Sequence, residues 1–395
     1  MKKLIALAVA ALPLAAMADV TLYGNIEASV EGGKSNGYGF SSGRDNVTGE
    51  QLHSTKNLKS GVRIDDTGSY IGFKGNEDLG NGLKAIWQVE QGLNIDGTTG
   101  SGSGNGYNNT WATRDSFVGL TGDFGTVRLG RLSTYLNSDM EKYDAWIYGA
   151  GVNGATITSA NTLDGRINNA IRYDSPNIAG FKFTALYGAD EQREYASNNT
   201  RTNKNIWNLG LGYENSGYFV DASYVGYMDQ NYGSVDDGTS NKYGKGDKNG
   251  NYWRIEGGYN ANNLLVAAAY GQSKLYGANS PVFGQVGGVA IGDVVDGHTM
   301  TGADIANIEF KTQEAALTLG YTIGAFTPKF TYARVWDIKA NGNKIEDNAL
   351  NQYVVGVDYA LSKRTTTYAS YGYVDHKANE VSSEQTFAVG VQHKF

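Results

Sequence analysis

Apolar residues recur at every second position along most of this chain, in short runs separated by Gly, Asn and Asp. In the segment 19–31, the apolar residues Val20, Leu22, Ile26 and Val30 alternate with polar ones. A β-strand places successive side chains on opposite faces, so a run of this kind has one apolar face and one polar face. The pattern therefore predicts a protein built of amphipathic strands.

Sixteen such runs can be traced, and they predict sixteen strands. The runs span 19–31, 69–75, 83–93, 111–121, 125–131, 166–174, 181–189, 205–214, 217–228, 250–260, 263–273, 308–321, 325–337, 350–361, 366–376 and 387–395. Short turns and long polar loops alternate between them. The long loops span 32–68, 94–110, 132–165, 190–204, 229–249, 274–307, 338–349 and 377–386. Short turns on one rim and long loops on the other are typical of outer-membrane barrels.

A soluble β-sandwich also has alternating strands, but there the apolar face packs into a core. A sheet in a membrane must close on itself, because hydrocarbon offers no hydrogen-bond partner to its edges. Barrels of about sixteen to eighteen strands leave an aqueous channel inside. We therefore predict an all-β fold: a 16-stranded antiparallel transmembrane β-barrel with long extracellular loops and short periplasmic turns.

The composition excludes several other classes of protein. A mean hydropathy of −0.40 is too low for a bundle of membrane helices, each of which would need about 20 consecutive apolar residues. The chain has no Cys and only 4 His, so we predict no disulfide, no metal site and no cofactor. The formal net charge of −7 argues against a nucleic-acid partner.

The first 18 residues have the layout of a secretory signal peptide. Lys2 and Lys3 make a basic start, the stretch 4–14 is apolar, and Ala16-Met17-Ala18 is a small-x-small cleavage site. We expect residues 1–18 to be removed on export and residues 19–395 to form the barrel.

Four stretches and the last residue resemble the trimeric general porins of Gram-negative bacteria, and the neisserial type most closely. They are DVTLYGNIEASVE, SYIGFKGNEDLGNGLKAIWQVEQ, RDSFVGLTGDFGTVRLGR, NAIRYDSPNIAGF and the terminal Phe395. The resemblance covers the whole mature chain and is weakest in the loops 32–68 and 274–307. It implies an outer-membrane homotrimer in which each subunit has a channel narrowed by an inward-folded third loop. It also implies that Phe395 is a signal read by the barrel-assembly machinery.

Strand parity selects the residues that we expect to face the channel. With Ile71, Trp87, Phe117 and Ile167 among the residues that meet lipid, one wall of the channel is basic. The expected wall residues are Lys74, Lys84, Arg114, Arg128, Arg166 and Arg172, with Tyr70, Gln88 and Glu90 also in the lumen. They can also be read as ordinary solvated strand charges, because Arg or Lys on the lipid face costs about 2–4 kcal/mol at the midplane. General porins carry a basic ladder on this stretch, and the resemblance therefore favours the wall.

The third long loop, about 132–165, carries the acidic residues Asp139, Glu141 and Asp144. By analogy with the family, we expect it to fold into the barrel and set its carboxylates against the basic wall as a constriction. It lacks the family's PEFGG-like run, and a plain solvated loop is the alternative. Six wall cations against three loop acids and Glu90 predict a weak anion preference.

The expected function is general diffusion of ions and small hydrophilic solutes across the outer membrane of a Gram-negative bacterium. A substrate-specific sugar or organic-anion channel is the main alternative, because Tyr23 and Tyr70 are expected in the lumen. An adhesin that displays the loops 229–249 and 274–307 is a third possibility. We do not expect an enzyme, because none of the four His lies beside a Ser or paired carboxylates at a useful spacing.

Overall fold

The computed structural model describes residues 20–34, 43–44, 51–52, 60–97, 111–146, 165–191, 202–231, 235–236, 242–277, 294–295, 298–377 and 382–395. The expected signal peptide, 1–18, lies outside the described residues, as do parts of the long loops. No helix in the described ranges is long and apolar enough to cross a membrane.

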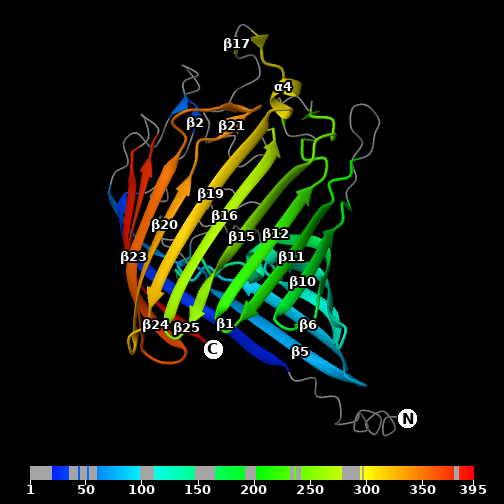
Figure 1. The fold of residues 1–395 in the computed structure, drawn as a ribbon, viewed down its shortest axis with the longest axis vertical. Coiled ribbons are helices and arrows are strands. Elements are labelled where there is room, and N and C mark those ends of the chain that lie inside the picture. Colours follow the sequence, from blue (N-terminus) through cyan, green and yellow to red (C-terminus); the bar gives the residue numbers. More distant parts are fainter. Residues whose placement is uncertain are drawn as a thin grey trace, which may run out of the picture.

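One large sheet contains most of the strands (Figure 1). Its strands are β1 (Thr21–Lys34), β4 (Gly61–Asp65), β5 (Tyr70–Gly80), β6 (Leu83–Gly92), β7 (Ser116–Gly122), β8 (Gly125–Ser133), β9 (Arg166–Asp174), β10 (Phe181–Gly188), β11 (Ile206–Asn215), β12 (Tyr218–Tyr227), β15 (Gly250–Ala261), β16 (Leu264–Tyr276), β19 (Glu309–Tyr321), β20 (Phe326–Val335), β21 (Lys339–Ala340), β22 (Asn343–Lys344), β23 (Leu350–Ala360), β24 (Thr365–His376) and β25 (Glu384–Lys394). The remaining elements are β2 (Gly43–Arg44), β3 (Gln51–Leu52), β13 (Val235–Asp236), β14 (Lys242–Tyr243), β17 (Val294–Val295), β18 (His298–Thr299), α2 (Tyr135–Asp139) and α4 (Gly302–Ala306).

The sheet closes on itself, because the first strand pairs antiparallel with the last. β1 is in register with β25 from Asn25 opposite Lys394 to Lys34 opposite Gln385, and its other edge pairs with β5 and β4. Each remaining strand pairs antiparallel with its neighbour in the chain. β4 and β5 together make one barrel strand, while β21 and β22 extend β20 and β23. The predicted 16-stranded antiparallel barrel is confirmed.

Two stretches that we predicted as loop contain strand. β4 lies within the expected loop 32–68, where a turn separates it from β5. The Asp66 carboxylate makes this turn by accepting the backbone N–H groups of Gly68 and Ser69, which interrupts the strand pattern. β21 and β22 form a small hairpin within the expected loop 338–349.

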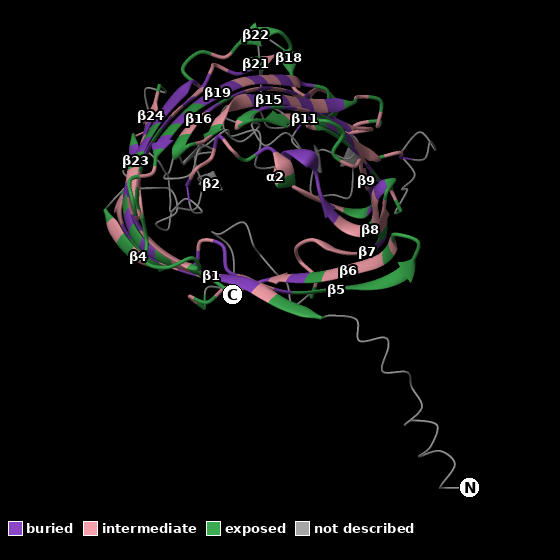
Figure 2. Ribbon diagram, turned by 60° about the horizontal axis from the view of Figure 1, so that its bottom comes forward, coloured by how far each residue is buried: buried purple, intermediate pink, exposed green. Residues whose placement is uncertain are grey.

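Exposure is the reverse of that in a soluble protein, because apolar side chains are exposed and polar ones are buried. On β11, β12, β15 and β19, the outward side chains include Leu211, Val220, Ile255 and Leu319. The alternating positions are buried and polar, and they include Asn208, Asp221, Ser223, Arg254, Glu256, Glu314 and Thr318. Figure 2 shows the strands as a ring with α2 inside it. The apolar surface therefore faces outward, where a membrane would cover it, and the polar surface faces inward.

Two parity assignments on the early strands are wrong. Phe117 lies opposite Gln88, on the face away from the exposed Val118, so its ring points inward. The sequence is ambiguous there because two apolar residues are adjacent. Ile167 packs with Leu186, which is buried on the inner side. The reason is a register shift between β8 and β9. Asn169 of β9 lies at this shift and has a left-handed backbone with φ of 53°.

Candidate channel lining and third loop

The first part of the third loop, residues 134–146, runs inside the barrel against its inner wall (Figure 2). It begins with the short helix α2, whose N-cap Thr134 accepts a hydrogen bond from the backbone N–H of Asn137. Three groups of contacts attach this segment to strands β11, β12, β15 and β20.

Tyr135 makes the first attachment, because its ring rests on a strip of the wall without side chains. Gly210 and Gly212 are successive inward positions of β11, and a Cβ at Gly210 would overlap the Tyr135 ring. The Tyr135 hydroxyl donates to Asp221 at 2.7 Å, and its backbone N–H donates to the side chain of Asn208 at 2.7 Å. Glycine is therefore needed here because a ring occupies the space of its missing side chain.

Arg254 makes the second attachment and is fully buried. Its guanidinium donates to the backbone carbonyls of Leu136, at 3.2 Å, and of Met140, and lies over the Tyr143 ring at 4.8 Å from the ring centre. Leu136 lies in this one-turn helix and Met140 is its C-cap, and the last carbonyls of a helix have no partner within it. Arg254 thus supplies both charge and donors to the end of α2.

Trp146 makes the third attachment, on the wall beyond β19. Its indole N–H donates to the Thr331 hydroxyl at 2.8 Å. The Lys329 ammonium lies 4.7 Å from the centre of the Trp146 ring, donates to the carbonyl of Ala145 and forms an ion pair with Asp358 at 2.8 Å. The segment therefore follows the wall from β8 as far as β20.

The four predicted arginines all have carboxylate partners. Arg172 pairs with Asp139 at 2.8 Å and with Asp174 at 2.7 Å, and Arg128 also pairs with Asp174. Of the three loop acids, Asp139 is thus the one placed against this part of the wall. Glu141 is exposed, and the Asp144 carboxylate accepts the backbone N–H of Trp146 at 3.2 Å.

Arg114 and Arg166 lie with the other predicted lumen residues. Arg166 pairs with Asp115 at 2.7 Å, and the Gln88 side chain donates to the carbonyl of Asp115 at 3.0 Å. Arg114 pairs with Glu90 and lies over the Tyr70 ring at 4.6 Å. Arg114 precedes β7, so its position depends on these contacts and not on the parity of that strand.

Lys74 and Lys84 differ from the four arginines. The Lys74 ammonium lies 4.9 Å from the centre of the Tyr23 ring, and the Tyr23 hydroxyl in turn donates to Glu90 at 2.9 Å. Both lysines are exposed, and neither has a carboxylate partner among the residues that the structure describes. Within the same ranges, no group of three or more His, Cys, Asp or Glu could hold a metal ion.

Comparison with known proteins gives the family. A family model described as Gram-negative porin matches residues 5–379. The major outer membrane proteins P.IB of Neisseria sicca and Neisseria lactamica are each 36% identical, over 100% of this chain and 99% of theirs. The chain belongs to the Gram-negative porin family.

Solved structures of the same fold include an anion-selective porin from Comamonas acidovorans, at 21% identity and a TM-score of 0.64, which covers 96% of this chain and 100% of that one. OmpF of Salmonella typhi matches at 18% identity and a TM-score of 0.60, over 96% of this porin and 98% of that chain. The family and its neisserial relatives place this porin in the outer membrane as a diffusion channel.

The last residue of this porin lies at the seam of the barrel. The backbone N–H of Phe395 donates to the Gly24 carbonyl at 3.1 Å, and the N–H of Gly24 donates back at 3.2 Å. The Phe395 ring lies so close over Gly24 that a Cβ there would meet it at 2.6 Å. The terminal residue thus takes part in closing the sheet between β1 and β25.

The residues that hold the third loop of this porin, above all Arg254 and Lys329, were not predicted from the sequence. Strand parity contained a signal for Arg254, since it lies between Trp253 and the exposed Ile255. Parity could not show its partner, because the contact with Met140 joins residues 114 positions apart. Asp115 and Asp174, which pair with the arginines, were also missed.

Proposed function

We propose that this porin is a general diffusion channel for ions and small hydrophilic solutes, with a weak preference for anions. The observation that carries the proposal is the distribution of charge among the six predicted basic residues. Each arginine has a carboxylate beside it, so the fields of the two charges largely cancel beyond a few ångströms. Lys74 and Lys84 form no ion pair with a carboxylate among the described residues, so their charge is compensated less than that of the arginines, although Asp78 lies opposite Lys84 in the register of β5 and β6.

A net positive wall favours anions because channel charges are incompletely screened over short distances. The Debye length is about 8 Å at physiological salt, and low-dielectric walls strengthen the field on a passing ion. The preference is weak because four of the six predicted basic residues already pair with carboxylates, and only the two lysines lack an ion pair among the described residues. Solutes then cross by size exclusion and this field, without tight binding.

The test is the reversal potential of the reconstituted channel in a steep KCl gradient. We expect the unmodified channel to favour Cl⁻, and the double variant Lys74→Gln with Lys84→Gln to shift the potential toward that of K⁺. A matched control, Glu90→Gln with Arg114→Gln, removes one charge of each sign and leaves the net charge of the wall unchanged, so a much smaller shift is expected. A preference of the unmodified channel for K⁺, or a lysine variant with the original potential, contradicts the proposal.

We infer the assembly from the family in the same way. A homotrimer is supported by the fold neighbour OmpT of Vibrio cholerae, whose structure is described as a trimer form. Residues 1–18 would serve export, outer-membrane lipid would cover the apolar outer face, and Phe395 would be read by the barrel-assembly machinery before it enters the seam. These assignments are proposals for this chain.

A further inference from the structure

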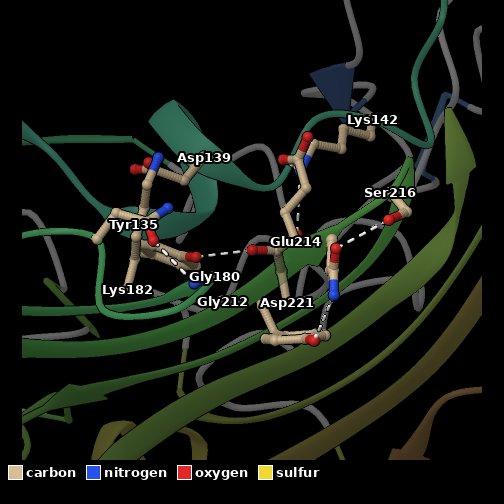
Figure 3. A pocket seen from close by; sticks show the side chains of 12 residues that line it. Tyr135, Asp139, Lys142, Gly180, Lys182, Gly212, Glu214, Ser216 and Asp221 are labelled. Atoms are coloured by element: carbon tan, nitrogen blue, oxygen red, sulfur yellow. Dashed lines mark hydrogen bonds and ion pairs between the residues drawn. The ribbon is translucent and has the colours of Figure 1, made fainter. Parts of the chain in front are cut away.

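A cavity of about 440 Å³ lies between the third-loop segment and the inner wall of β10, β11 and β12 (Figure 3). Tyr135, Asp139 and Lys142 line it from the loop, and side chains near the short turns line it from the wall. Its volume is within the range of sites that hold small molecules, which is about 300–1,000 Å³. The mechanism of general diffusion makes no use of this cavity.

Strand register explains how the wall side of the cavity is built. Lys182 of β10 is directly opposite Gly212 of β11, which is directly opposite Asp221 of β12. Neighbouring strands are about 4.8 Å apart, so the backbones of Lys182 and Asp221 are separated by about 10 Å with a glycine between them. Glu214 is two positions along β11 on the same face, diagonal to Lys182 at about 7–8 Å between Cα atoms.

Some charges of the cavity are already satisfied by the protein. Asp221 accepts the Tyr135 hydroxyl at 2.7 Å, and Asp139 forms its ion pair with Arg172 at 2.8 Å. Lys142 is shared, at 3.4 Å each, between Asp221 and Glu214.

Two opposite charges remain available to a ligand. The Lys182 ammonium is exposed and has no hydrogen bond or ion pair with any other described residue. The Glu214 side chain is 64% exposed, and its contact with Lys142 is long for an ion pair. A cation and an anion thus face one cavity from neighbouring strands, and a solute with a single charge can neutralise only one of them.

We propose that this cavity is a low-affinity site of the channel for small zwitterions, meaning free amino acids and short peptides. The carboxylate of the solute binds the Lys182 ammonium, and its amino group binds the Glu214 carboxylate. Weak binding is what permeation needs, because a solute must also leave the site. The inference rests on the proposed function, since the solute reaches the cavity through an open channel.

The test uses the reconstituted channel in planar bilayers, with glycylglycine at neutral pH as the probe. Glycylglycine should reduce the KCl current in a saturable way, with a half-maximal effect at a lower concentration than acetate, methylammonium or the same peptide capped at both ends. Lys182→Gln and Glu214→Gln should each raise that concentration roughly 1.5-fold to fivefold, as loss of one partly exposed ion pair would. Lys363→Gln, at an exposed turn between β23 and β24, is the matched control and should leave it unchanged.

The outcomes separate this inference from the proposed function. A channel that conducts KCl but shows no peptide effect, or equal effects in both variants and the unmodified protein, overturns the zwitterion site alone. Acetate acting at the same concentration as the peptide also overturns it and indicates a simple anion site. Absence of KCl conductance in the unmodified protein overturns the proposed function itself.

Discussion

Glycine at an inward position decides where a ring of the third loop can rest. The same arrangement recurs along the sheet: the ring of Tyr23 covers Gly72, and that of Tyr368 covers Gly390. On the outer face, Trp87 covers Gly75 in the same way. Each pair joins neighbouring strands and fills the gap that a glycine leaves in the pleat. These glycines and the rings that cover them share one structural role.

The substitution Gly210→Ala tests this role where it bears on the channel. The added methyl group would overlap the Tyr135 ring, and overpacking of this kind costs about 1–3 kcal/mol. We expect the loop to shift from the wall toward the channel axis, which lowers the single-channel conductance. The control is Gly257→Ala on β15, where a Cβ would lie 3.4 Å from its nearest neighbour and the conductance should not change. An unchanged conductance in Gly210→Ala would contradict the conclusion that the Tyr135 ring rests on Gly210.

At the scale of elements, the long-loop side of the barrel contains local structures with their own stabilising contacts. The helix α4 has a capping box, in which the Thr301 side chain accepts the N–H of Asp304 and the Asp304 carboxylate accepts the N–H of Thr301. The Thr301 hydroxyl and backbone N–H, helped by His298, lower the pKa of Asp304 to about 2. A depressed carboxyl pKa means that ionisation of Asp304 favours the folded cap.

The capping box therefore predicts a pH dependence of α4 alone. The ionised Asp304 contributes fully above its unfolded pKa, about 3.9, and the contribution is lost as the pH falls toward the folded pKa. Hydrogen exchange at the Ile305 amide, which donates to the Thr301 carbonyl at 3.1 Å, should lose protection relative to its intrinsic rate over this window. Asp304→Asn should show low protection without that pH dependence. Constant protection in the unmodified protein across the window would show that the cap is not coupled to ionisation.

At the scale of the whole molecule, closure of the sheet and the polar inner face leave a channel partly filled by the third loop. A general channel should then admit solutes by size. In liposome swelling with sugars from mono- to tetrasaccharides, we expect rates that fall smoothly with solute size. One sugar with a rate far above the trend would favour a specific channel, for which the Tyr23–Tyr70 pair at 6.3 Å offers a surface. No swelling at all would favour an adhesin or an enzyme.

Much of the barrel was predictable from local pattern. The strand Arg166–Asp174 was predicted with both its ends, and most other ends were within three residues, because each run carries its own alternation. The misassigned Phe117 and Ile167 show the limit of parity, which fails where two apolar residues adjoin or a bulge shifts the register. The sequence predicted that Arg172 is a basic residue of a strand and faces the channel. It did not predict the ion pairs of Arg172 with Asp139 and Asp174.

The sequence by itself determined the closed amphipathic sheet, because a period of two residues is local and any single strand reveals it. Only the tertiary structure decided where the third loop rests and which charges in the lumen remain unpaired. The position of the loop and the pairing of these charges depend on contacts between distant residues, such as the hydrogen bond between Trp146 and Thr331, which are 185 residues apart. Such contacts form only once all the strands between them have been put in register, and no local pattern encodes that distance.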